Sequence, residues 1–550
     1  MKKYISRFAI VLGISAGSLT LFSYTDPGER YFLIVKNLDI FASVFKEIDT
    51  YYVDEINPNK LMQIGVDAML ESLDPYTVYI PEDRIEDFRT QTTGEYGGIG
   101  ALVGLRNGKQ TVLMPYEGYP ADKYGLRIGD IIEKVDGVDI NNKSNDEINS
   151  LMKGQANTKV TLTITRYGSA KPIDITLVRE HITVNNVPYF GKLNDKTGYI
   201  KLSDFTTNAS GEVKDALLAL KKEGAENLIL DLRDNPGGLL EEAINISNLF
   251  IPKGVEVVSI KGKTTESSQT FYARNNSVDE KIPIVVLVSS RSASASEIVA
   301  GVIQDYDRGI LVGDKTFGKG LVQTARPLPY NSQIKLTTAK YYIPSGRCIQ
   351  AIDYSNRNFD GSAGKIADSL KIKFLTQNGR PVYDGGGIDP DKLVEPEPLA
   401  PISASLLASG LIFDFATVYH SQHENLPPVK EFMVSDAVYK EFTNWLKNKD
   451  YSYTTRVEQE IIELEQAARL EKSYADIQPQ LDALRQRFVH DKARDLQEFK
   501  PEILHLLKQE IAGRYYLESG VMEASFERDP DIQEALAILQ NTASFQKLLK

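Results

Sequence analysis

The segment between residues 197 and 350 constrains the fold most, because short apolar runs alternate there with amphipathic helical patterns. Ile284–Val288 is apolar at every position, and Leu228–Leu232 is apolar except for Asp231. Runs of this kind predict strands that are buried on both faces, which is typical of a parallel sheet. The intervening helical patterns are Val213, Ala216, Leu217 and Leu220; Leu240, Ala243, Ile244, Ser247 and Phe250; and Ile298, Val299, Val302 and Ile303. We therefore expect an α/β core in which both faces of the sheet are covered.

The composition argues against several classes of function. The chain has 550 residues and a formal net charge of −12, and it has no long basic run, which argues against a nucleic-acid-binding surface. Its one cysteine, Cys348, cannot form an internal disulfide bond, and the five histidines are scattered along the chain. Because cysteine and histidine lack the spacing of metal ligands, we expect neither a metal nor another cofactor. A chain of this length should form about three or four domains.

The N-terminus has the pattern of an export signal. Lys2, Lys3 and Arg7 precede an apolar run from Phe8 to Phe22, as a charged region precedes the apolar region of a signal peptide. The run is short for a transmembrane helix, but no clear Ala-x-Ala cleavage site follows it. Residues 1–24 are therefore a signal peptide or an uncleaved anchor in the inner membrane. Either interpretation predicts an exported protein of the periplasm or cell envelope.

Helical patterns flank the sheet-forming segment. The first covers residues 35–90, and the second runs from about Pro428 to Lys550. In the second, one apolar stripe consists of Val457, Ile461, Leu464 and Ala468. The simpler interpretation of this stripe is a helical bundle that packs on itself or on the core. A dimerisation arm is the alternative, although no heptad repeat is sustained.

A third pattern, of short strands and glycine turns, lies between about Glu95 and Arg179. It contains the string Pro-Ala…Gly-Leu-x-x-Gly-Asp-x-Ile…Val-Asp-Gly, which begins at Pro120 and resembles a PDZ domain. The resemblance implies a peptide-binding loop that consists of Gly98, Ile99, Gly100 and Ala101. Backbone N–H groups of such a loop capture the terminal carboxylate of a peptide, and the edge strand adds the peptide by β-augmentation. Ala101 stands where PDZ loops usually carry an aromatic residue, so the peptide preference stays open.

Ser294 lies between an apolar strand and a helical pattern, in the string Ser292-Ala-Ser-Ala-Ser-Glu297. With Glu297 it fits a Ser-x-x-Glu capping box, so the simpler interpretation of Ser294 is a helix N-cap. A serine at this place also lies where backbone N–H groups and the helix dipole stabilise negative charge. Ser294 is therefore a candidate nucleophile as well, and the Ala295 N–H group is a candidate oxyanion donor.

Lys319 lies between two glycines, just before Leu321. A surface turn is the simpler interpretation of this lysine alone. If the strand includes it, however, Lys319, Leu321 and Gln323 share one face, and a buried Leu321 would bring the other two inward. Burial disfavours the charged amine, and a neutral lysine can accept a proton from a serine hydroxyl. Gln323 would then hold the amine in line.

The loop Asp231–Gly238 follows one of the apolar strands and precedes a helical pattern. Ligands of α/β sheets bind at such strand ends. Gly237 or Gly238, with Gly238 favoured, could supply a second backbone N–H group for an oxyanion, and a plain turn is the alternative. We expect Arg233 and Asn235 to support the loop rather than to react.

Together these motifs resemble the carboxy-terminal processing proteases, the tail-specific serine endopeptidases of peptidase family S41. The resemblance runs from about Leu38 to Ile388, and it includes Leu73–Tyr76 and Tyr341–Arg347. The site residues that it implies are Ser294 as nucleophile, Lys319 as general base, Gln323 as its support, and Ala295 with Gly238 or Gly237 as oxyanion donors.

The resemblance also implies an architecture. We expect an α/β multidomain protein with a ClpP/crotonase-like protease core, an inserted PDZ domain, a helical N-terminal lead-in and a helical C-terminal extension. The expected divisions are residues 1–24, a signal peptide or membrane anchor; 35–90, the N-terminal helical region; 91–183, the PDZ domain; 184–394, the protease core; and 402–550, the C-terminal helical domain.

The function implied is that of a serine endopeptidase that cleaves exported proteins near their C-termini by a Ser-Lys mechanism. Its PDZ domain would recognise the C-terminus of the substrate, so the expected partners are proteins with accessible C-terminal tails. A membrane anchor, a homodimer and an adaptor partner stay open. The alternatives are a non-catalytic PDZ adaptor with a protease-like core, and a Ser-His hydrolase of small esters.

Overall fold

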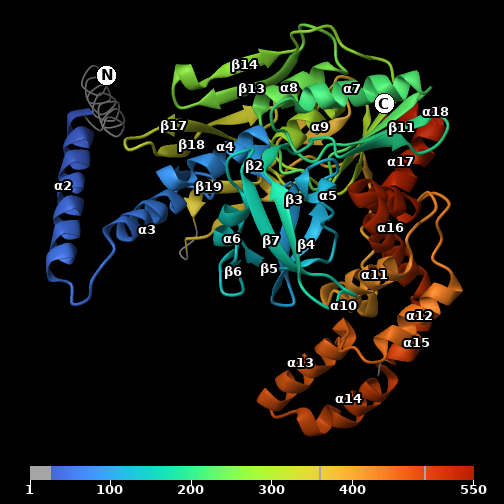
Figure 1. Cartoon of the computed structure of the whole chain (residues 1–550). Helices are drawn as coiled ribbons and strands as arrows, with labels where there is room; N and C mark the ends of the chain where they lie inside the picture. Colours follow the sequence, from blue (N-terminus) through green and yellow to red (C-terminus); the bar gives the residue numbers. More distant parts are fainter. Residues whose placement is uncertain (1–26, 358–360, 489–490) are drawn as a thin grey trace, which may run out of the picture. The chain divides into compact units, whose positions relative to one another are not determined.

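The computed structural model describes residues 27–357, 361–488 and 491–550, in two compact units that divide between Tyr79 and Ile80. The expected signal peptide or anchor lies outside the described residues. The described part of the first unit contains α2 (Pro27–Tyr51) and α3 (Pro58–Glu71), as the helical pattern predicts. The second unit, residues 80–550, contains the central sheet and the helices that cover it (Figure 1).

The centre of the second unit is a six-stranded sheet. Its strands, in spatial order, are β10 (Tyr189–Lys192), β11 (Thr197–Lys201), β12 (Asn227–Asp231), β15 (Ile284–Val288), β16 (Ile310–Gly313) and β23 (Lys392–Leu393). All neighbours from β11 to β23 run parallel, and only β10 is antiparallel to its neighbour. The predicted parallel sheet is therefore confirmed.

Successive residues of these strands pack against different helices. Leu228, Leu230 and Val286 belong to a core with α7 (Ala209–Lys222), α8 (Leu240–Asn248) and α9 (Ala295–Asp305). Ile229 and Val285 point to the other face, where they pack against α17 (Pro530–Gln540) and α18 (Thr542–Leu548). Both faces are covered, as predicted, but the second is covered by the last helices of the chain.

The PDZ segment forms a separate sheet with its own core. Its strands, in spatial order, are β3 (Ala101–Arg106), β4 (Lys109–Pro115), β5 (Ile131–Val135), β7 (Lys159–Thr165) and β8 (Ile173–Val178), with β6 (Val138–Asp139) paired to β5. Two helices, α5 (Pro120–Lys123) and α6 (Asn145–Met152), belong to the same segment. β3 lies at one edge of the strand order, where a further strand could be added.

A third sheet packs against the core on the α7–α9 face of the central sheet. Its strands include, in order, β17 (Leu321–Pro327), β18 (Gln333–Tyr342), β13 (Glu256–Gly262) and β14 (Gln269–Tyr272). Three short hairpins or pairs complete the strands considered: β2 (Glu95–Gly98) with β9 (Glu180–Thr183), β19 (Ile352–Arg357) with β20 (Ala363–Lys365), and β21 (Lys373–Leu375) with β22 (Pro381–Tyr383). α4 (Ile85–Thr93) leads into β2.

The helical part after residue 400 has a core of its own. Its helices are α10 (Pro401–Ala408), α11 (Leu411–Gln422), α12 (Asp436–Leu446), α13 (Arg456–Leu470), α14 (Tyr474–Phe488), α15 (Lys492–Glu498) and α16 (Lys500–Ser525). Figure 1 shows α13 and α14 side by side, and buried Ile461 and Leu481 lie on this pair. The expected apolar stripe is only half buried: Ile461 and Ala468 are buried, whereas Val457 and Leu464 are 45% and 49% exposed. The last helices, α17 and α18, pack on the core sheet instead.

No single helix within the described ranges is long and apolar enough to cross a membrane. α10 and α11 meet those criteria only as a pair bent by 65°. Their apolar residues Leu406, Ile412 and Phe415 are fully buried in the helical core.

Candidate active site

Ser294 occupies a strained turn between β15 and α9. Its backbone has φ 55° and ψ −112°, a combination that costs a residue other than glycine about 1–3 kcal/mol. Hydrogen bonds of the two preceding residues, Ser292 and Ala293, hold the turn in place. The Ser292 hydroxyl donates to the Leu232 carbonyl at 2.7 Å, and the Ala293 N–H group donates to the Asn235 carbonyl at 3.0 Å. The turn therefore places a half-buried serine at the start of a buried helix.

Glu297 is fully buried one turn into α9, and its carboxyl group accepts four hydrogen bonds. Oε2 accepts the backbone N–H groups of Ser294 at 2.8 Å and Lys319 at 2.9 Å. Oε1 accepts the Thr316 hydroxyl at 2.6 Å and the Gly318 N–H group at 2.8 Å. Burial raises the pKa of Glu297, and these hydrogen bonds oppose that effect. One side chain thus fixes the serine turn against the lysine turn.

Lys319 lies outside the strand that the sequence suggested. β17 begins at Leu321, so the pleat of a strand does not determine where Lys319 points. Its backbone is held instead, by Glu297 and by the Tyr341 hydroxyl. That hydroxyl lies 2.5 Å from the Lys319 carbonyl oxygen and 3.1 Å from the Ser294 carbonyl oxygen. Glu297 and Tyr341 therefore each contact the backbones of both Ser294 and Lys319.

Gln323 lies within β17 and is half-buried. Its amide nitrogen is 3.2 Å from the hydroxyl of Thr337 on the neighbouring strand β18. The pairing of β17 with β18 changes register between Val322 and Gln323. The side chain is therefore anchored to β18, next to the segment that carries Lys319.

The glycine pair of the Asp231–Gly238 loop lies directly against the serine turn. A β-carbon placed on Gly237 would lie 2.8 Å from the Ala295 nitrogen and 2.9 Å from the Ser294 β-carbon, so only glycine fits there. The Gly237 N–H group donates to Asn235 Oδ1 at 2.9 Å. Among the described residues, the N–H groups of Ala295 and Gly238 have no protein acceptor. Of the two glycines, Gly238 is therefore the one whose N–H group has no acceptor in the described part of the chain.

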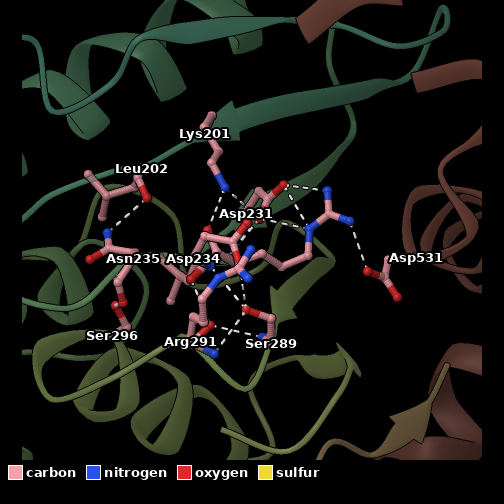
Figure 2. A network of polar contacts seen from close by, with 12 residues as sticks. Lys201, Leu202, Asp231, Asp234, Asn235, Ser289, Arg291, Ser296 and Asp531 are labelled. Carbon is pink, nitrogen blue, oxygen red and sulfur yellow. Dashed lines mark hydrogen bonds and ion pairs between the residues drawn. The ribbon is translucent and has the colours of Figure 1, made fainter. Parts of the chain in front are cut away.

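A polar network holds this loop from the side of the serine turn (Figure 2). Asn235 donates to the Leu202 carbonyl at 2.8 Å, and its own carbonyl accepts the Ser296 hydroxyl at 3.0 Å. Asp234, at φ 64°, accepts hydrogen bonds from Arg291 and from Ser289. The expected supporting role of Asn235 is consistent with these contacts.

The strand end before the loop carries a buried charge cluster. Asp231 is 1% exposed and lies beside Arg233 and Lys201, at 2.6 and 3.2 Å. Burial opposes ionisation, but the two cations together hold the pKa of Asp231 well below its usual value. Tyr199 donates its hydroxyl to the same carboxylate at 2.7 Å. Arg233 is thus held at the base of the loop, in agreement with its expected supporting role.

The predicted peptide-binding loop joins β2 to β3. Gly98 is the last residue of β2, Ile99 is buried, and Gly100 has φ 71°. Carbonyls in the loop are used within the domain, since Ile99 accepts from Ala121 at 2.7 Å and Gly100 accepts from Tyr116 at 2.9 Å. Ala101 begins the edge strand β3. The N–H groups of Ile99 and Gly100 have no acceptor within the described ranges.

The sequence pattern did not indicate the roles of several residues around this site. Tyr341 lies in a motif that we noted, but nothing in the sequence indicated that its hydroxyl reaches the Ser294 turn. Thr316 carried no signal beyond its nearness to Lys319. Asp529 and Asp531, which bind Arg233, lie in the helical region with no local motif. Within the described ranges, no group of three or more histidine, cysteine or acidic residues could hold a metal ion.

Comparison with known proteins identifies three segments of the chain. The model of peptidase family S41 matches residues 196–355, a PDZ domain model matches 111–166, and a model described as "Probable PDZ-protease, C-terminal helical domain" matches 402–539. The fold and these matches define a serine-type peptidase with a PDZ domain.

Similar proteins with curated names show which group of serine-type peptidases the chain belongs to. A carboxy-terminal-processing protease of Bartonella bacilliformis is 40% identical over 321 residues, which cover 58% of this chain and 73% of that protein. A probable CtpA-like serine protease of Staphylococcus aureus is 40% identical over 317 residues, covering 57% and 62%. A solved photosystem II D1 C-terminal processing protease is 27% identical, covers 66% of this chain and 93% of its own, and has a TM-score of 0.35. The chain belongs to the carboxy-terminal-processing proteases of peptidase family S41.

Proposed function

We propose that this chain is an endopeptidase that cleaves exported proteins near their C-termini by a Ser-Lys mechanism. The Ser294 hydroxyl attacks the scissile carbonyl, and Lys319 in its neutral form accepts the hydroxyl proton. Lys319 then returns this proton to the leaving amine. In the second step water attacks the acyl-enzyme, and Lys319 accepts a proton from the water and passes it to the departing Ser294 oxygen. Gln323 orients the lysine amine.

One observation carries this proposal. The backbones of Ser294 and Lys319 are held by a single oxygen of buried Glu297. A general base must lie within hydrogen-bond reach of the proton that it removes, and a shared anchor limits how far the two turns can separate. Three histidines do not offer an equivalent arrangement. The ring of His420 packs against Tyr515, and His423 and His505 form hydrogen bonds within the helical part of the chain.

The oxyanion would be bound by the N–H groups of Ala295 and Gly238. Ala295 directly follows Ser294, and Gly238 directly follows Gly237, which lies against the Ser294 turn. Neither N–H group donates to another acceptor in the part of the chain that the structure describes. Ala295 also begins α9, so the helix dipole adds to the stabilisation of negative charge. Donors fixed in advance in this way stabilise the transition state without reorganisation.

Substrate recognition is assigned to the PDZ domain. The loop Gly98–Ala101 would bind the terminal carboxylate, and the peptide would pair with edge strand β3. Substrates are then proteins with accessible C-terminal tails. The apolar run at Phe8–Phe22 supports export to the periplasm or envelope, with residues 1–24 acting as a cleaved signal or as an anchor.

The proposal is tested by labelling with a fluorophosphonate, which reacts with activated serines. Wild type should be labelled and should cleave a peptide substrate, whereas Ser294→Ala should do neither. Ser290→Ala is the matched control, because this exposed serine lies just before the turn. Labelling or cleavage by folded Ser294→Ala at the wild-type rate would refute the assignment.

A further inference from the structure

Helix α17, the last but one of the chain, approaches the loop that carries Gly237 and Gly238. Its apolar residues Ile532, Ala535 and Ile538 pack on the core sheet. This packing brings the start of the helix to the end of β12, where the loop begins. Asp529 is the N-cap of α17 and accepts the Ile532 N–H group at 3.1 Å, and Asp531 lies in the first turn.

Arg233 joins the loop to this helix. On one side, its Nε and Nη2 atoms donate to Asp231 at 3.1 and 2.6 Å. On the other side, Nη1 donates to Asp529 at 2.9 Å and to Asp531 at 2.8 Å. The three ionic side chains of this outer contact are only 15–17% exposed. A planar guanidinium that binds partners at both ends fixes position and angle more closely than a lysine could.

The backbone between Arg233 and the glycines leaves little room for independent movement. The Arg233 carbonyl accepts the Lys201 amine at 2.6 Å, and the Asp234 N–H group donates to Ser289 at 3.1 Å. Asn235 is bound at both its amide and its carbonyl, and Gly237 touches the serine turn. A shift of the Arg233 side chain would therefore be passed along the loop to the N–H group of Gly238.

We propose that Arg233, Asp529 and Asp531 are positioning residues, through which helix α17 sets the place of the oxyanion donor Gly238. This inference rests on the proposed Ser-Lys function. The C-terminal region then contributes to the chemical step as well as to the fold, although none of these three residues touches the substrate.

The test is the double variant Asp529→Asn/Asp531→Asn in the full-length chain. Asparagine keeps the shape of both side chains and is an equally good N-cap, so the helix should stay docked. Glu534→Gln is the matched control, since it removes an acidic charge from the same helix at its contact with Lys392. We expect kcat per titrated active site to fall about tenfold in the double variant with KM within about twofold, because small misplacements of donors reduce the rate of the chemical step.

A second readout separates positioning from general stability. A peptide boronate forms a tetrahedral adduct with the nucleophile and places an oxygen in the oxyanion site. Its inhibition constant should rise by the same factor as kcat/KM falls, while the thermal midpoint of the double variant stays equal to that of Glu534→Gln. An unchanged kcat, or a lower kcat with unchanged boronate affinity, would overturn the proposal.

Arg233→Lys supplies an independent check. It keeps the charge but cannot span both sets of carboxylates. Adding the two asparagine substitutions to folded Arg233→Lys should cost no further activity, and a fully additive loss would contradict the coupling. Failure of the Ser-Lys function itself looks different, because Ser294→Ala or Lys319→Ala would then cleave as wild type does.

Discussion

Ser294 and Lys319 donate their backbone N–H groups to the same atom, Oε2 of Glu297, at 2.8 and 2.9 Å. The two turns come from different connections of the core sheet, one after β15 and one after β16. Glu297 therefore ties the backbones of the proposed nucleophile, Ser294, and the proposed base, Lys319, to one carboxylate oxygen.

Glu297→Gln should lower kcat by roughly 100-fold, since a misplacement of about 1 Å has an effect of this size. The glutamine keeps one acceptor oxygen, but its NH2 group would face two donors, so two hydrogen bonds are lost. Stability should fall by about 1–3 kcal/mol, the usual cost of unsatisfied buried groups. Activity per titrated site and urea unfolding measure these effects. Exposed Glu241→Gln on α8 is the control, and a wild-type kcat in folded Glu297→Gln would contradict the role of Glu297.

Gly237→Ala should lower kcat by at least about 100-fold, comparable to the loss of an oxyanion donor. Gly237 has φ 93°, and an added β-carbon would lie 2.7 Å from the Ala293 carbonyl oxygen. The loop would have to move away from Ser294. Gly254→Ala is the control for backbone strain. Gly254 has φ 89°, so alanine is strained there too, but no atom lies within 4 Å of the added carbon. Equal rates for the two variants would show that the close approach at Gly237 is unimportant.

Removal of residues 530–550 should prevent the core from folding, because α17 and α18 cover one face of the central sheet. Uncovered Ile229, Val285 and Leu287 would form an apolar surface prone to aggregation. Removal of residues 456–488, the α13–α14 pair, should leave a soluble core with the same fold. Soluble yield and circular dichroism of both deletions distinguish these outcomes. A soluble, active chain without residues 530–550 would contradict the assignment of α17 and α18 to the core.

His420 should make stability depend on pH. Burial, with Arg127 and Arg514 nearby, lowers the pKa of His420 from its usual 6.5. Below pH 6.5 the unfolded chain therefore binds more protons at this position than the folded chain, so its contribution is full above pH 6.5 and is lost as pH falls toward the lowered pKa. Because the ring is partly exposed, the loss should be at most about 1 kcal/mol.

Urea midpoints at about pH 5.5 and pH 7.5 bracket the ordinary histidine pKa and test this expectation. The difference between the two midpoints should be smaller in His420→Gln than in wild type. His181→Gln, at a largely exposed position, serves as the control. An identical pH dependence in wild type and His420→Gln would rule out a contribution from His420.

The sequence predicted those features that depend on local pattern. Continuous apolar runs such as Ile284–Val288 predict a buried parallel strand, and the Ser-x-x-Glu spacing places Ser294 at a helix start; the structure contains both.

Features that depend on tertiary contacts were not predictable. Lys319 was expected to point inward through the pleat of a strand, but the strand starts two residues later and backbone hydrogen bonds to Glu297 and Tyr341 hold the turn. No local pattern joins Arg233 to Asp529, since the two are brought together only by the packing of α17 on the sheet. The boundaries of the five expected domains stay a prediction.

The most direct test of the central claim is cleavage of a protein with a disordered C-terminal tail by wild type and by Lys319→Ala, with products identified by mass spectrometry. Lys315→Ala is the control, because this nearby lysine pairs with Asp389 at 2.8 Å. Wild type and Lys315→Ala should cut within the tail, and folded Lys319→Ala should leave it intact. Cleavage by Lys319→Ala at the wild-type rate would contradict the Ser-Lys mechanism.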